Sequence, residues 1–271
     1  MTDLNSLTPE EKEAINRLRN FKNASYRYAQ TEEHRVKNFV DPEEYDKRLK
    51  NSLRRDEVLV KEDKARRVEK ATLEWKNKVG KTFSEATTDN PLIHDRVNRL
   101  ATNQGKHKTS MILHGDLGVG KTWTAHAFIN LAIEAGAVTP GQIAMGDETS
   151  LLGKIAPSGY DRPALLEDLL NPKYKIYFID EVGRGYFSND LSRTNLWTAL
   201  VDHVYTHQLS LVMTTNKHLT DNSLGAWMGA AAFDRLKALV GKDGAIIPGR
   251  VNRRGAVLEK EEEKHRSRKT R

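Results

Sequence analysis

The strongest constraint on this chain is the segment from Gly115 to Thr122, which reads Gly-Asp-Leu-Gly-Val-Gly-Lys-Thr and is a complete G-x-x-x-x-G-K-T phosphate loop. The apolar residues 110–114 before it predict a short buried strand, and residues 123–135 after it carry apolar side chains at helical spacing. A strand, a glycine-rich loop and a helix in this order are typical of an α/β nucleotide site. A glycine-rich turn without a ligand is the alternative, and the flanking elements argue against it.

The residue types in this loop suit the binding of phosphate groups. Glycines let the backbone pass close to an anion, so that successive N–H groups and the start of the helix point at it. Lys121 is expected to contact the β- and γ-phosphates, and Thr122 to bind Mg²⁺. The predicted cofactors are therefore ATP and Mg²⁺. The residues predicted to bind the nucleotide are Gly115, Gly118, Val119, Gly120, Lys121, Thr122 and Trp123.

Composition excludes several kinds of site. The 271 residues include no cysteine, so disulfide bonds, thiolate zinc sites and cysteine nucleophiles are ruled out. No stretch approaches the roughly 18 apolar residues of a membrane helix, and the first residues lack the pattern of a secretory signal. We therefore expect a cytoplasmic protein without a membrane partner. The formal net charge of +7 favours an anionic partner such as nucleic acid.

The distribution of charged and apolar residues predicts four parts. The first is dense in charged residues and has no strand pattern, which indicates a small all-helical domain. A helix that begins near Pro42 would be long and charged, and its sparse apolar side chains fit packing on a neighbouring helix better than a surface reserved for a partner. The predicted parts are a helical partner-binding domain at 1–85, a linker at 86–109 with one helix near 91–101, an ATPase domain at 110–250 and a basic, disordered tail at 251–271.

Apolar strand segments alternate with helical segments in the third part, and this alternation predicts a parallel sheet. The fold class is therefore α/β, with a P-loop core in which helices flank a parallel five-stranded sheet. A small all-helical domain precedes this core. The predicted strands are 110–114, 142–145, 176–179, 209–214 and 245–247.

Polar residues follow two of these strands where a nucleotide site needs them. The apolar run 175–179 ends in Asp180 and Glu181, which is the pattern of a Walker B strand. Asp180 would hold Mg²⁺, and Glu181 would act as the general base that polarises the attacking water. Asn216 follows the next strand and would sense the γ-phosphate, with a plain turn residue as the alternative.

Arg235 is the candidate for a group that neutralises charge in the transition state. A guanidinium suits the charge that develops on a transferred γ-phosphate. If its helix lies at the edge of a subunit, Arg235 would act on the nucleotide of a neighbouring copy, and hydrolysis would depend on assembly. An ordinary salt bridge with Asp234 or another acid is the alternative.

These motifs, in this order and spacing, resemble the AAA+ ATPases of the bacterial DnaC/IstB type, and the resemblance covers residues 105–250. That family comprises loaders of replicative helicases and transposition helper ATPases. The resemblance implies an AAA+ core that hydrolyses ATP weakly unless it is stimulated by assembly, DNA or a partner. The residues that match the family's motifs are Lys121 and Thr122 in Walker A, Asp180 and Glu181 in Walker B, Asn216 as sensor 1 and Arg235 as the arginine finger.

The resemblance also implies partners. The expected function is an ATP-dependent helicase loader that binds a hexameric replicative DNA helicase, self-associates through its ATPase domain and places the helicase on single-stranded DNA during replication initiation. The alternative is a transposition helper that binds duplex DNA and recruits a transposase. A scaffold that binds ATP only for structure is a third hypothesis, against which Glu181 argues. Candidate single-strand contacts are Lys154, Tyr160 and Arg162, and candidates for a second sensor arginine are Arg250, Arg253 and Arg254.

Overall fold

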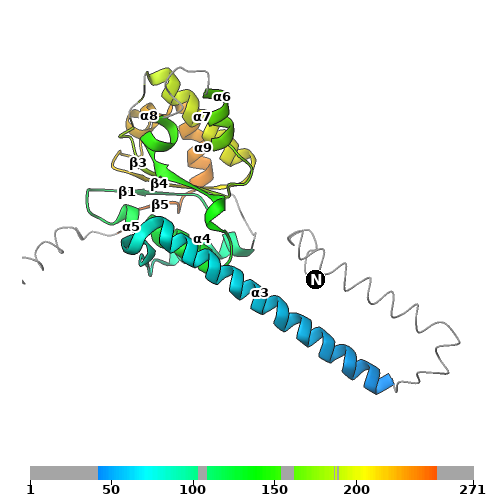
Figure 1. The fold of residues 1–271 in the computed structure, drawn as a ribbon. Coiled ribbons are helices and arrows are strands. Elements are labelled where there is room, and N and C mark those ends of the chain that lie inside the picture. Colours follow the sequence, from blue (N-terminus) through cyan, green and yellow to red (C-terminus); the bar gives the residue numbers. More distant parts are fainter. Residues whose placement is uncertain (1–41, 103–108, 154–161, 186, 188, 249–271) are drawn as a thin grey trace, which may run out of the picture. The chain divides into compact units, whose positions relative to one another are not determined.

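The computed structural model describes residues 42–102, 109–153, 162–185, 187 and 189–248 (Figure 1). The chain divides into two compact units, residues 1–65 and residues 66–271. The basic tail from residue 249 and the first 41 residues lie outside the described residues, so what the sequence predicts for them stays a prediction. No helix in the described part of the chain is both long enough and apolar enough to span a bilayer.

The second unit is built on five parallel strands, which confirms the predicted sheet. The strands are β1 (Met111–His114), β2 (Ile143–Asp147), β3 (Ile176–Val182), β4 (Ser210–Thr215) and β5 (Ala245–Ile246). Their order in the sheet is β2-β3-β4-β1-β5, so β1 lies between β4 and β5. Because all strands are parallel, the loops after β1, β3 and β4 meet at the same edge of the sheet, where α/β folds bind ligands.

Successive strand residues point to opposite faces of the sheet, and both faces are buried. Ile176 and Phe178 of β3 pack in the cluster with α4 (Pro91–Thr102) and α5 (Lys121–Glu134). Tyr177 and Ile179 pack in the other cluster, with α7 (Asp190–Thr206) and α9 (Ala230–Val240). Figure 1 shows these two pairs of helices on opposite sides of the sheet. A sheet covered on both faces explains why its strands are continuous apolar runs.

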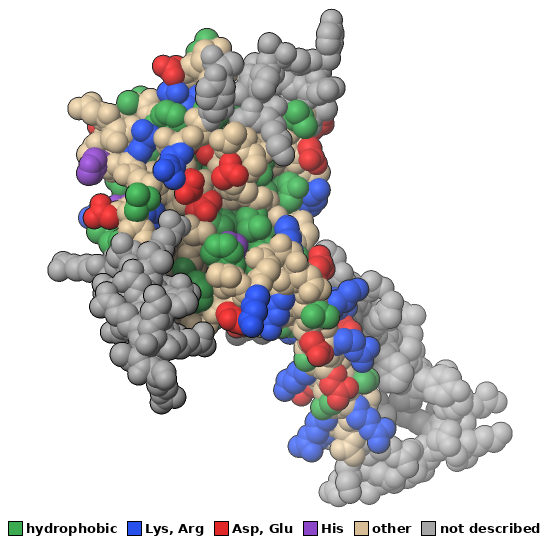
Figure 2. All heavy atoms as spheres, turned by 60° about the vertical axis from the view of Figure 1, so that its left-hand side comes forward, with side chains coloured by type: hydrophobic (Ala, Val, Ile, Leu, Met, Phe, Trp, Pro, Cys, Tyr) green, Lys and Arg blue, Asp and Glu red, His purple; other side chains and the backbone are tan. Residues whose placement is uncertain are grey.

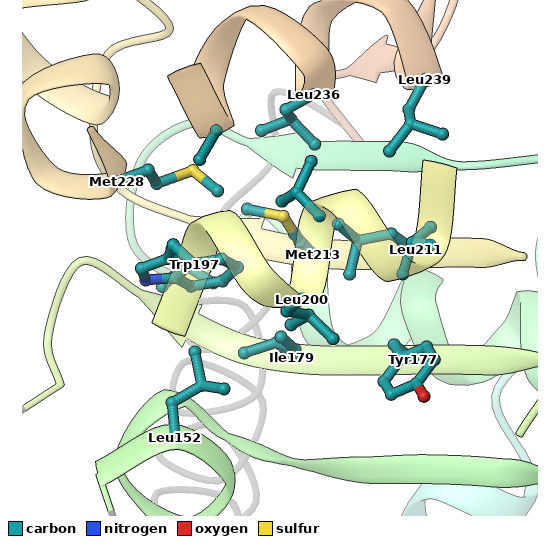
Figure 3. Close-up of a cluster of buried hydrophobic side chains, with 14 of the residues drawn as sticks. Leu152, Tyr177, Ile179, Trp197, Leu200, Leu211, Met213, Met228, Leu236 and Leu239 are labelled. Atoms are coloured by element: carbon teal, nitrogen blue, oxygen red, sulfur yellow. The ribbon is translucent and has the colours of Figure 1, made fainter. Parts of the chain in front are cut away.

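The cluster under α7 and α9 anchors the helix that follows the Walker B strand. Figure 3 shows Trp197 and Leu200 of α7 pointing toward Ile179 of β3. Both α7 side chains are fully buried. The N-terminus of α7 is capped by Asn189, whose side chain accepts a hydrogen bond of 2.8 Å from the Ser192 N–H. The position of α7 is therefore determined by packing and by its cap.

Short elements complete the second unit. They are η3 (Pro140–Gln142), η4 (Thr149–Gly153), α6 (Arg162–Leu169), η5 (Asp221–Gly225) and α8 (Ala226–Met228). Of these, η4 and α6 fall between β2 and β3. The candidate DNA contacts Lys154 and Tyr160 lie outside the described residues, and the Arg162 side chain does as well.

Helix α3 (Pro42–Ser84) begins at the predicted proline, and Gly80 interrupts it with φ 77° and ψ 171°. Its residues from 66 onward belong to the second unit. Trp75 is 2% exposed and donates a hydrogen bond of 2.7 Å to the Asn130 side chain of α5. The Asn130 amide in turn donates to the carbonyls of Phe83, at 3.0 Å, and Ala86, at 2.9 Å. The end of α3 is thus fixed to the helix that starts at the phosphate loop.

The predicted linker contains helix α4, which lies where the sequence predicts a helix. Its residues Ile93 and Val97 are buried in the cluster that contains α5. Arg96 is also buried, and its guanidinium donates to the carbonyl of Leu92 at 3.2 Å. Residues 91–102 therefore contribute to the core of the second unit, and the outer limits of the predicted linker stay a prediction.

Candidate nucleotide-binding site

The phosphate loop joins β1 to α5 with the backbone that its glycines allow. Gly118 and Gly120 have φ values of 84° and 92°, which side chains with a Cβ rarely adopt. Lys121 is the first residue of α5, and its Nζ donates to the carbonyl oxygens of Gly115, at 2.8 Å, and Asp116, at 2.7 Å. The ammonium group is therefore held over the loop, next to the first N–H groups of the helix, which are the groups that bind anions at a helix start.

The Walker B carboxylate of Asp180 lies against this loop. Thr122 Oγ1 donates to its two oxygens at 3.1 and 3.2 Å, and the Thr214 hydroxyl of β4 also donates to Oδ1. Burial raises the pKa of the Asp180 carboxyl above its ordinary value, whereas the hydrogen bonds from Thr214 and Thr122 lower it. A carboxylate beside a hydroxyl is an oxygen donor set that suits Mg²⁺. Thr122 and Asp180 are thus the residues here that fit a magnesium ion bound with the nucleotide.

Glu181 has a backbone conformation that is unusual for its residue type. Its φ is 56°, and its N–H donates to the Thr214 hydroxyl at 2.9 Å. Such a conformation costs energy unless surrounding contacts enforce it, and it occurs often at functional sites. The side chain is half exposed, and Oε1 accepts a hydrogen bond of 3.1 Å from Arg184. Glu181 therefore presents a solvent-accessible carboxylate beside the phosphate loop.

A cavity of about 760 Å³ gathers most of the predicted site residues. From the phosphate loop and α5 the predicted residues in its lining are Gly118, Gly120, Lys121, Thr122 and Trp123, beside the unpredicted Leu117, and from the strand ends they are Asp180, Glu181 and Asn216. Gly115 and Val119 are not in the lining. Gly115 contributes its carbonyl to the bond with Lys121, and the Val119 side chain is buried.

One wall of the cavity was missed by sequence reasoning. Thr82 and Phe83, at the end of α3, line it. The Phe83 ring stacks on His126 of α5 with 4.2 Å between centroids, and burial lowers the His126 pKa to about 4, so the stacked imidazole is neutral at pH 7. Trp123 Nε1 donates to the carbonyl of Thr87 at 2.9 Å. These contacts join residues far apart in sequence, and no local motif marks them.

Thr214 and Thr215 of β4 also line the cavity and were not predicted. Thr215 is buried, and its hydroxyl donates to the Val182 carbonyl at 2.7 Å. The same hydroxyl accepts a hydrogen bond of 3.0 Å from the Lys217 N–H. The residues before and after Asn216 are therefore both held by the Thr215 hydroxyl. The exposed Asn216 amide therefore stands at the cavity on a well-ordered turn.

Arg235 does not line this cavity. It lies on α9 and forms an ion pair with Asp202 of α7, in which both side chains are partly exposed. The salt bridge considered as the alternative is thus present within one chain, with Asp202 as the acid. Contact between Arg235 and a nucleotide would need a second copy of the chain, so its catalytic role stays a prediction.

Comparison with known proteins adds the family. The family described as "IstB-like ATP binding protein" matches residues 27–239. No curated protein matches the chain. Among solved structures, domain III of the Thermotoga maritima replication initiation protein DnaA is similar, with 13% identity and a TM-score of 0.39 over 54% of this chain. The chain spans 57% of the length of that structure.

The crystal structure of DnaI is a second similar structure, with 17% identity and a TM-score of 0.42 over 59% of this chain and 83% of the other. The family match covers most of the chain, including the phosphate loop, the Walker B strand and Arg235. Together with the parallel five-stranded sheet and the cavity at its edge, it means that the chain belongs to the IstB-like ATP-binding protein family and is an ATPase of the P-loop AAA+ type.

Proposed function

We propose that this ATPase is a helicase loader, which binds a hexameric replicative DNA helicase and places it on single-stranded DNA in the cytoplasm. The observation that carries this proposal is helix α3, a charged helix of 43 residues. The part of α3 that belongs to the first unit of the chain contains three consecutive exposed apolar residues. These are Val58, Leu59 and Val60, which are 52–61% exposed. The sequence pattern favoured packing of this helix on a neighbouring helix, but the exposure of these three residues favours docking on another protein instead.

The charges around this segment support a specific partner surface. Figure 2 shows basic and acidic side chains interspersed along the surface that α3 forms. Arg54, Arg55, Asp56 and Glu57 precede the apolar residues, and Lys61, Glu62 and Asp63 follow them. Charges of both signs around an apolar centre fix orientation and exclude wrong partners more than they add affinity.

The docking proposal predicts a selective loss of helicase binding. Replacing Val58, Leu59 and Val60 together with serine should abolish co-elution with the hexameric helicase in ATP, because the apolar contact area is removed. ATP affinity should stay unchanged, since these residues lie outside the unit that holds the cavity. Leu191→Ser is the matched control, because Leu191 of α7 is 70% exposed and should not matter for docking.

Unimpaired co-elution of the triple variant would show that α3 is not the docking surface. If the unmodified chain forms no complex with the helicase in any nucleotide state, the loader proposal itself fails.

The second candidate is a transposition helper, because the DnaC/IstB type of ATPase that the chain resembles includes such helpers as well as loaders. DNA preference separates the two. A loader should bind single strands more tightly than duplex, whereas a helper should assemble on duplex DNA. The net charge of +7 suits phosphate contacts in both cases, so each affinity should fall with salt and must be compared at one salt concentration.

Arg235 provides a test of self-association. If it contacts the γ-phosphate of a neighbouring copy, Arg235→Ala and Lys121→Ala chains should each be inactive alone, and a mixture should recover part of the ATP turnover. In the mixture, an intact nucleotide site of one chain can meet an intact Arg235 of another. Asp202→Asn is the control for the ion pair, because it frees Arg235 without removing it. A mixture as inactive as its components would leave Arg235 with only its structural contact to Asp202.

A further inference from the structure

Glu148, the residue directly after β2, is a buried carboxylate with four hydrogen-bond donors. It is 1% exposed, and neither the phosphate loop nor the Walker B motif includes it. Oε2 accepts from the backbone N–H groups of Gly183 and Gly185, both at 2.8 Å. Oε1 accepts from the indole N–H groups of Trp197, at 2.8 Å, and Trp227, at 2.7 Å. A buried carboxylate is tolerated only when hydrogen bonds compensate for the loss of water, as these four do. Removing it would leave all four donors without their acceptor.

Oε2 of Glu148 holds the loop that follows Glu181, the proposed catalytic base. Gly183 comes two residues after Glu181, and its φ of 95° is one that glycine adopts readily. The Lys217 side chain occupies the space that a Cβ on Gly183 would need: such a Cβ would overlap Lys217 Cε. At Gly185, a Cβ would lie 2.8 Å from both Cγ and Oε2 of Glu148. Both glycines thus let the chain turn around one carboxylate.

Oε1 of Glu148, through its hydrogen bond with Trp227, connects this loop to the turn that contains Asn216. The Trp227 ring forms cation–π contacts with Arg193, whose Cζ lies 4.0 Å from the ring centroid, and with Lys217, whose Nζ lies 4.7 Å from it. Arg193 also donates to the Trp227 carbonyl at 2.7 Å. Lys217 is the residue after Asn216. One carboxylate therefore joins, through few contacts, the loop after Glu181 and the turn of the proposed sensor.

We propose that Glu148 is a positioning residue for ATP hydrolysis, which sets the geometry of Glu181 through the backbone of Gly183 and Gly185, and that of Asn216 through Trp227 and Lys217. This inference rests on the proposed roles of Glu181 and Asn216 at the γ-phosphate. Glu148 itself does not line the cavity, so it would act through these contacts and not by touching the nucleotide. The phosphate loop has no hydrogen bond to Glu148, so ATP binding and ATP turnover should respond differently to its loss.

The test is Glu148→Gln. A glutamine side chain keeps one accepting oxygen, but its NH₂ group faces two N–H donors, so one pair of hydrogen bonds is lost. We expect kcat to fall about tenfold to 100-fold, since small displacements of positioned groups cost that much. The dissociation constant for a non-hydrolysable ATP analogue should change less than about threefold, with unchanged binding stoichiometry. Asp147→Asn is the matched control, because the Asp147 carboxylate accepts a hydrogen bond of 2.8 Å from the Ser150 N–H in its own turn and does not line the cavity, so its loss should leave kcat unaltered.

Tryptophan fluorescence shows whether the variant has lost the intended contacts, since Trp197 and Trp227 both donate to Glu148. An altered emission with kcat within about twofold of the unmodified chain would overturn the proposal, and so would a parallel loss of affinity and kcat. If Glu148→Gln does not fold, Gly185→Ala displaces the carboxylate without changing charge, and the same criteria apply. If neither variant folds, Glu148 is a structural residue and the proposal fails. Glu181→Gln separates failure of the Glu148 proposal from failure of the proposed role of Glu181, because it removes the proposed base itself. If Glu181→Gln slows hydrolysis and Glu148→Gln does not, only the Glu148 proposal fails.

Discussion

Lys121→Ala is expected to abolish detectable ATP binding. The ammonium group is held over the phosphate loop by the carbonyls of Gly115 and Asp116, so it is already positioned for the β- and γ-phosphates. Its removal should cost about 3 kcal/mol or more, as for other truncated charge pairs, which weakens binding by roughly 150-fold. Isothermal titration calorimetry with a non-hydrolysable ATP analogue measures this directly.

Lys173→Ala is the matched control for that experiment. Lys173 is half exposed, lies 4.0 Å from Asp168 and is not part of the cavity lining, so its loss removes the same charge without touching the site. The control should bind the analogue like the unmodified chain. Equal affinity in Lys121→Ala would remove the nucleotide assignment of the cavity.

Glu181→Gln is expected to bind ATP normally but to hydrolyse it about 100-fold to 10,000-fold more slowly, which is the contribution of a positioned general base. The amide keeps the shape of the side chain and can still accept from Arg184, but it cannot take a proton from water. Single-turnover hydrolysis, measured with the chain in excess over ATP, separates the chemical step from product release.

Glu167→Gln is the control, because Glu167 is an exposed acid of α6 outside the cavity lining. Unchanged single-turnover rates in Glu181→Gln would move the role of base to another group and would support a chain that uses ATP mainly for structure. A loss of ATP affinity in the same variant would instead mean that Glu181 helps to bind the nucleotide.

Local sequence patterns predicted the strand, loop and helix around residues 115–122, and most of the residues they assigned to the nucleotide site line one cavity. The chemistry of the loop from Gly115 to Thr122 needs residues that are contiguous, and the Walker B carboxylates follow a strand that is apolar because both faces of the sheet are covered. The alternation of strand and helix segments also predicted the parallel five-stranded sheet, although it did not give the order of the strands. In each case the signal lies within a few consecutive residues.

The rest of the site depends on contacts between distant segments, and no local pattern encodes these. Phe83 reaches the cavity because Trp75 and Asn130 fix the end of α3 on α5. Glu148 reads as one more acid after a strand, and only the fold brings it to the loop after Glu181. Arg235 could be interpreted as an arginine finger or as a salt-bridge residue, since the sequence does not show that α7 brings Asp202 beside it.

The attachment of α3 to Asn130 has a consequence for how such proteins exchange partners. A chain shortened to begin at residue 86 would lose Trp75 from its core and Phe83 from its cavity, so it should bind ATP poorly for reasons unrelated to any partner. A chain that begins at Arg66 retains both. Recombination that replaces the N-terminal segment should therefore yield an active chimaera when residues from Arg66 onward stay together, so a crossover can fall inside α3, between Pro42 and Arg66, and need not fall in a loop.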